Sequence, residues 1–132
     1  GACTDSNYAY QYGLPGTFAP IADYELLNQA VETAKRQGTN VVVGNVLSSD
    51  VFYNAMGNVN DLWRGMGVLA VEMEAAALYM NAAKAGKKAL CMLTISDHLY
   101  TGEHLSAEDR QLGFKKMMEI ALETAVEMAK QP

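Results

Sequence analysis

The chain has 132 residues, half of them hydrophobic, and ten basic against fifteen acidic residues give a net charge of -5 at pH 7. This length predicts one domain with one core, and the apolar content excludes a chain that stays disordered. The acidic balance, without a basic stripe, argues against nucleic acid or an anionic membrane as partner. Cys3 and Cys91 are far apart in sequence and no signal peptide or membrane-spanning run is found, so we expect reduced thiols in a cytoplasmic protein.

The first half of the chain predicts a strand end, a loop, a helix and a buried strand. Residues 1–6 are typical of the end of a strand, and the Gly- and Pro-containing stretch 7–20 indicates a loop. A helix is expected from Asp23 to about Gln37, since Gly38 follows basic residues of the last turn. The unbroken apolar run 41–47 predicts a strand buried on both faces.

The second half predicts a strand–helix–strand unit followed by a long helix. Apolar runs 68–71 and 89–95 indicate two buried parallel strands, joined by a helix over 74–85 that stops at Gly86. Ser106 with Asp109 resembles the capping box of a helix. The expected core-facing stripe of that helix is Phe114, Met117, Met118, Ala121, Ala125 and Met128.

Acidic residues follow two of these predicted strands. Glu72 and Glu74 come after the first strand of the unit, and Asp97 comes after the second. The carboxyl ends of parallel strands meet at one sheet edge, where open α/β sheets bind ligands. The sequence therefore predicts a functional site at this edge, although Glu72 and Glu74 could also be acids that favour a helix N-terminus.

The residues that accompany each acid in the sequence suggest a nucleoside site. A carboxylate such as that of Glu74 can accept two hydrogen bonds from the vicinal hydroxyls of a ribose, and the Met73 thioether can pack on the sugar. Neighbouring carboxylates and partial desolvation favour a protonated Asp97, as a general acid requires. Phe52 offers a flat apolar surface for a heterocycle. We interpret His98 and His104 as structural or solvent-facing residues, because no metal-ligand spacing links them.

Two paired motifs resemble those of the nucleoside phosphorylase and nucleosidase superfamily. They are VEMEAA at residues 71–76 and SDH at residues 96–98. The runs GACTDS at 1–6 and EDRQ at 108–111 narrow the resemblance to hexameric, bacterial-type purine nucleoside phosphorylases. The implied fold is α/β, a three-layer arrangement with a mixed, mostly parallel central sheet flanked by helices. Residues 1–132 would be the C-terminal portion of a single domain that lacks its N-terminal strands.

The resemblance implies a role for each residue of the nucleoside pocket. Glu74 would hydrogen-bond the ribose hydroxyls, with Met73 and Glu72 completing the sugar pocket. Phe52 would pack on the purine, and Val71 would contribute to the base pocket.

The resemblance also implies a catalytic group. Asp97 would donate a proton to purine N7 with Ser96 beside it, and Arg110 would approach Asp97 to help drive that proton onto the base. The implied reaction is transfer of a pentosyl group: phosphate attacks the anomeric carbon of a purine ribonucleoside or deoxyribonucleoside, giving free base and (deoxy)ribose 1-phosphate. Phosphate is the co-substrate, and no metal or organic cofactor is implied.

The resemblance covers about half of such an enzyme, which leaves alternatives open. In the family a glycine loop and arginines hold the phosphate, and a histidine from a neighbouring subunit closes the site. None of these has a counterpart here. We therefore expect a homo-oligomer or a complementing N-terminal chain as partner, and a poor or inactive catalyst from the isolated chain. The alternatives are a nucleosidase of the same superfamily, which uses water, and a non-catalytic nucleoside-binding or assembly fragment.

Overall fold

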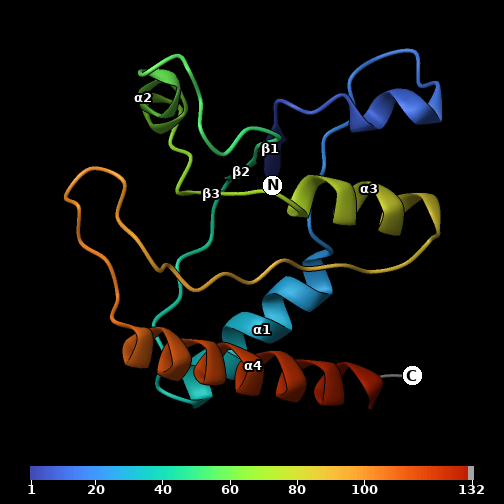
Figure 1. Cartoon of the computed structure of the whole chain (residues 1–132). Helices are drawn as coiled ribbons and strands as arrows, with labels where there is room; N and C mark the ends of the chain where they lie inside the picture. The colour runs from blue at the N-terminus through green and yellow to red at the C-terminus, as the bar shows by residue number, and fades with distance from the viewer. Residues whose placement is uncertain (131–132) are drawn as a thin grey trace. The chain divides into compact units, whose positions relative to one another are not determined.

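A computed structural model describes residues 1–130 of the chain, which pack as two compact units. The first unit contains residues 1–23 and 42–90, and the second contains residues 24–41 and the chain from residue 91. Figure 1 shows the elements along the chain. Each unit is described by itself, and the prediction that both belong to a single phosphorylase domain stays a prediction.

The first unit is built on a parallel sheet of three short strands. These are β1 (Ala2–Thr4), β2 (Val46–Ser48) and β3 (Ala70–Glu72), hydrogen-bonded in the order β1-β2-β3 (Figure 1). The register aligns Thr4 with Ser48 and Ser48 with Glu72, so the strands end together at one edge. The parallel α/β organisation predicted from the sequence is confirmed.

Helix α3 (Ala75–Lys84) follows β3 directly and contacts β1 and the 3-10 helix η1 (Tyr8–Tyr12). Four buried side chains of α3 join Ala2 and Leu47 in the core; they are Ala75, Ala76, Tyr79 and Met80. Gly86, with φ of 62°, ends the helix because its amide turns back to the Ala83 carbonyl. The short helix α2 (Val59–Gly65) precedes β3.

The second unit pairs helix α1 (Tyr24–Arg36) with helix α4 (Ala107–Ala129). The buried residues are Ala30, Thr33 and Ala34 on α1, and Ile120 and Thr124 on α4. At one end of the pair, Glu123 accepts hydrogen bonds from Arg36 at 2.8 Å and from the Gln37 amide at 2.6 Å. Helix α1 begins and ends close to the predicted positions, and α4 begins at the predicted cap.

The strand predicted over residues 89–95 is wrong. Among the described residues this segment joins no sheet, and the Ala89 carbonyl instead accepts a hydrogen bond from the Asp23 amide. A strand exists only with a neighbour that pairs its backbone groups, and apolar content alone does not supply one. The predicted strand–helix–strand unit is therefore not closed by residues 89–95.

The predicted burial of the other two apolar runs is also wrong. The run 41–47 forms a strand only from Val46, and Val42 is 83% exposed. In the run 68–71, Leu69 and Val71 are exposed as well. An apolar run is buried only when another element covers it, so these side chains lie uncovered within the described part of the chain.

The predicted apolar stripe of α4 is partly wrong. Met117, Ala121 and Met128 are half-buried, whereas Phe114, Met118 and Ala125 are exposed. The position of α1 decides which stripe is covered, and it selects the side that carries Ile120 and Thr124. None of the helices within residues 1–130 has the length and apolar character needed to cross a membrane.

Candidate functional site

Buried polar side chains gather where the three strands of the first unit end. Ser48, the last residue of β2, donates a hydrogen bond from Oγ to Glu72 Oε1, and its Oγ accepts one from the Ala76 amide at 2.8 Å. Glu72 Oε2 accepts from the amides of Glu74 and Ala75, each at 2.6 Å. Glu72 lies two residues before Glu74, the N-cap of α3, and its carboxylate accepts from amides at the beginning of that helix.

A second group of polar side chains connects β1 to the segment after β2. The Ser49 hydroxyl donates to Asp5 Oδ2 at 2.7 Å, and the Asp50 amide donates to Asp5 Oδ1 at 2.8 Å. Asp5 thereby fixes the backbone two residues before Phe52. Nothing in the local sequence pattern singles out Ser48, Ser49 or Asp5, so their roles at this edge were not predicted.

The predicted nucleoside-contacting side chains of this unit lie on its surface. Phe52 is 74% exposed and meets Tyr53 edge to face, with ring centroids 4.8 Å apart. Val71, Met73 and Glu74 are also exposed, and Glu74 Oε2 accepts a hydrogen bond from the Met73 amide at 3.2 Å. A planar apolar ring, a thioether and a carboxylate are therefore available to a ligand.

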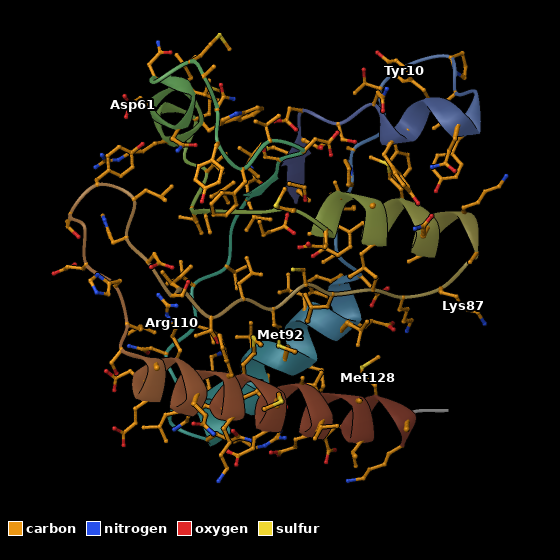
Figure 2. The ribbon with its side chains drawn as sticks, in the orientation of Figure 1. Tyr10, Asp61, Lys87, Met92, Arg110 and Met128 are labelled. Carbon is orange, nitrogen blue, oxygen red and sulfur yellow. The ribbon has the colours of Figure 1, made fainter. Side chains whose placement is uncertain are left out.

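The second unit brings Ser96, Asp97 and Arg110 together. Arg110 lies near the beginning of α4 (Figure 2), and its Nη2 donates to Asp97 Oδ1 at 3.1 Å. The Ser96 hydroxyl donates to Asp97 Oδ2 at 2.5 Å. Arg110 Nε is buried and has no hydrogen-bond partner within the described residues. A cation and a hydroxyl in contact with the two oxygens of an aspartate compensate its negative charge, and so stabilise the carboxylate that remains after a proton is donated.

The beginning of α4 is fixed by a cap, as the sequence predicts. Ser106 Oγ accepts a hydrogen bond from the Asp109 amide at 3.0 Å and donates to Asp109 Oδ2 at 2.7 Å. This cap sets the first helical turn, from which Arg110 extends.

His98 holds the loop between Asp97 and α4. Its Nδ1 accepts from the Thr101 amide at 3.1 Å, and its own amide donates to the Glu103 carbonyl at 2.7 Å. A single antiparallel bridge joins Asp97 to His104. These bonds agree with the structural role that the sequence indicates for the two histidines.

The predicted site residues thus form two groups, one in each unit. The first group contains Glu72, Met73 and Glu74 with Phe52, and the second contains Ser96, Asp97 and Arg110. That the two groups share one sheet edge stays a prediction. Within residues 1–130, the structure contains no group of three or more His, Cys, Asp or Glu residues arranged to hold a metal ion.

Comparison with known proteins identifies the kind of chain that carries these groups. The sequence model described as the phosphorylase superfamily matches residues 1–131. A DeoD-type purine nucleoside phosphorylase of Shewanella baltica is 49% identical over 126 residues, covering 96% of this chain and 53% of the relative. The corresponding protein of Bacillus cytotoxicus is 49% identical over 127 residues, covering 96% and 54%. The chain spans about half the length of the curated relatives it matches, and the matching half is C-terminal.

A solved structure shows the same fold. The crystal structure of purine nucleoside phosphorylase from Toxoplasma gondii in complex with immucillin-H matches with a TM-score of 0.83 and 17% sequence identity. The match covers 99% of this chain and 54% of that chain. At this identity the similarity concerns the fold alone, and it confirms the phosphorylase-like α/β class predicted from the sequence.

Proposed function

Because this chain belongs to the phosphorylase superfamily, we propose that it supplies the nucleoside-binding and proton-donating half of a purine nucleoside phosphorylase. The observation that carries the proposal is the contact of Arg110 and Ser96 with the two oxygens of Asp97. The predicted site needs an acid at this position, and the pair is built within the second unit alone. The proposed reaction is reversible transfer of a pentosyl group from a purine nucleoside to phosphate.

Bond cleavage would begin at the base. A proton passes from Asp97 to purine N7, so that the base leaves as a neutral molecule when the N-glycosidic bond breaks. The Arg110 guanidinium compensates the charge of the aspartate that remains. Phosphate then attacks the anomeric carbon of the oxocarbenium-like ribosyl group, giving pentose 1-phosphate.

The first unit would hold the nucleoside. Glu74 accepts hydrogen bonds from the ribose hydroxyls, Met73 packs on the sugar, and Phe52 packs on the purine with Val71 beside it. Their exposure supports this role, because each presents a free surface of the chemistry that a nucleoside needs. Inosine and adenosine are the substrates to test, since a carboxylic acid at residue 97 suits both 6-oxo and 6-amino purines.

We propose that the phosphate site comes from a second polypeptide segment. The relatives are about twice as long as this chain, and uncovered apolar side chains such as Val42 are available for contact. The partner is a complementing N-terminal half or further copies of the chain in a homo-oligomer. The proposal includes a cytoplasmic enzyme of purine salvage that requires phosphate and no cofactor.

The test combines this chain with the N-terminal half of the Shewanella baltica relative and follows base release from inosine, with and without phosphate. We expect release that requires both polypeptides and phosphate, and a fall of about 100- to 10,000-fold in Asp97→Asn. Asp50→Asn is the matched control and should retain the activity. Release without phosphate would favour a nucleosidase, and nucleoside binding without turnover would favour a non-catalytic fragment.

A further inference from the structure

Ser48 is a buried residue at the centre of the strand-end edge of the first unit. It is 4% exposed, and its place in the sheet register lies between Thr4 of β1 and Glu72 of β3. Its carbonyl accepts from Thr4 Oγ1 at 2.8 Å, while its hydroxyl serves both Glu72 and the Ala76 amide. One side chain therefore connects β2 with the end of β3 and the first turn of α3.

Glu72 directs its carboxylate into the protein. Three donors approach its two oxygens: the Ser48 hydroxyl and the amides of Glu74 and Ala75. A carboxylate has about four acceptor positions, so internal groups use most of this capacity. The early amides of a helix need such acceptors because they have no partner within the helix.

From these contacts we infer that Ser48 and Glu72 are positioning residues: they orient the beginning of α3 and with it Glu74, the residue that the proposed function assigns to the ribose. The inference rests on the proposed function and deepens it. Met73 and Glu74 lie between the end of β3 and the first turn of α3. The Ser48–Glu72 link therefore fixes the backbone that carries both residues. Glu74 is exposed and free to face a ligand, whereas Glu72 is half-buried.

Removal of the Ser48 hydroxyl should loosen this turn. Ser48→Ala leaves the Ala76 amide without an acceptor and frees Glu72 Oε1, so Glu74 would no longer be held in one direction. Ser48→Thr keeps a hydroxyl and should restore the link. Ser6→Ala is the matched control, because it removes a hydroxyl that accepts from the Tyr8 amide elsewhere in the same unit.

The first measurement is amide hydrogen exchange by NMR on the full 132-residue chain without ligand. We expect exchange at Ala76 to become about tenfold faster in Ser48→Ala, with wild-type rates in Ser48→Thr and Ser6→Ala. Unchanged exchange in Ser48→Ala would overturn the inference whatever the chain binds.

The second measurement compares binding of inosine with that of 2',3'-dideoxyinosine, which lacks the hydroxyls that Glu74 would bind. We expect Ser48→Ala to reduce the preference for inosine about tenfold and Ser48→Thr to restore it. Altered exchange with an unchanged preference would show a purely structural link and overturn the positioning role.

Two further variants separate the acids and do not depend on how well Ser48→Ala folds. Glu74→Gln should reduce the preference for inosine much more than Glu72→Gln, which keeps an acceptor oxygen for the two amides. Equal losses would show that Glu72 contacts the sugar directly and would overturn the inference. Failure of the wild-type chain to bind inosine, with protected amides intact, would instead overturn the proposed function and with it the sugar role.

Discussion

The contact of Arg110 with Asp97 connects a helix to the loop before it through two side chains. Arg110 is the first-turn residue whose Nη2 reaches Asp97 Oδ1, and its buried Nε has no hydrogen-bond partner within the described residues. A guanidinium that is held at only one of its edges still has N–H donors for a further acceptor. Its contribution to the proposed reaction therefore depends on charge and not on packing alone.

Arg110→Ala should lower turnover about tenfold to a hundredfold in the complemented enzyme, with little change in KM, because in the proposed reaction the cation assists the proton transfer and has no contact with the sugar. The measurement is steady-state phosphorolysis of inosine. Lys115→Ala, in the same helix and exposed, is the control and should leave turnover unchanged. Wild-type turnover in Arg110→Ala would contradict this role.

At the scale of elements, the pairing of α1 with α4 is stabilised by a small apolar contact and by a polar cluster, which consists of Glu123, Arg36 and Gln37. Ile120 is 4% exposed, whereas Leu122, two residues further on the same helix, is 69% exposed. The two residues test directly which face of α4 is covered.

Ile120→Ala should lower the free energy of unfolding by about 2 to 4 kcal/mol, because it removes buried methyl groups and leaves a cavity. Leu122→Ala should change it by less than about 0.5 kcal/mol, since that side chain is exposed in the folded chain. Urea unfolding followed by circular dichroism measures both. A larger loss from Leu122→Ala would show that another surface covers the opposite face.

The polar cluster of this helix pair predicts a dependence on pH. The hydrogen bond from Arg36, followed by that from Gln37, lowers the pKa of Glu123, and desolvation opposes this shift. A carboxyl whose pKa is lower in the folded chain stabilises the fold above its unfolded pKa, and this stabilisation is lost as pH falls through the folded pKa. Thermal unfolding of the wild type should therefore lose more stability between pH 6 and about pH 3 than that of Glu123→Gln. Equal losses would contradict the prediction.

At the scale of the whole molecule, the uncovered apolar side chains and the length of the relatives both bear on whether further polypeptide covers part of this surface. Val42 and Leu122 are exposed, and the curated relatives are about twice as long as this chain. A protein partner that covers such residues would stabilise the fold through apolar burial.

The intact mass of each chain, measured under denaturing conditions, shows whether further polypeptide is present in the purified material. On the proposed function, we expect the active material to contain sequence beyond these 132 residues, either in a heavier chain or in a second polypeptide, and its presence to reduce the binding of an apolar dye. Activity from material that contains only the 14.3 kDa chain would contradict the need for a complementing half.

The sequence alone predicted the features that depend on neighbouring residues. Gly38 and Gly86 mark helix ends and Ser106 marks a helix beginning, because capping and left-handed backbone are decided within a few residues. The place of Glu72 and Glu74 at the end of β3 also follows from local pattern. The approach of Arg110 to Asp97 was expected only from the resemblance to a known family, since the strand predicted before Asp97 is not formed.

Tertiary structure decided the features that depend on distant partners. The run 89–95 has the composition of a strand but pairs with no strand in the described part of the chain, and the covered face of α4 follows from the place of α1. Ser48 contacts Glu72 across 24 residues of sequence, which no periodicity encodes. Pairing, burial and capping by a remote side chain each require a second group in space, and the fold alone supplies it.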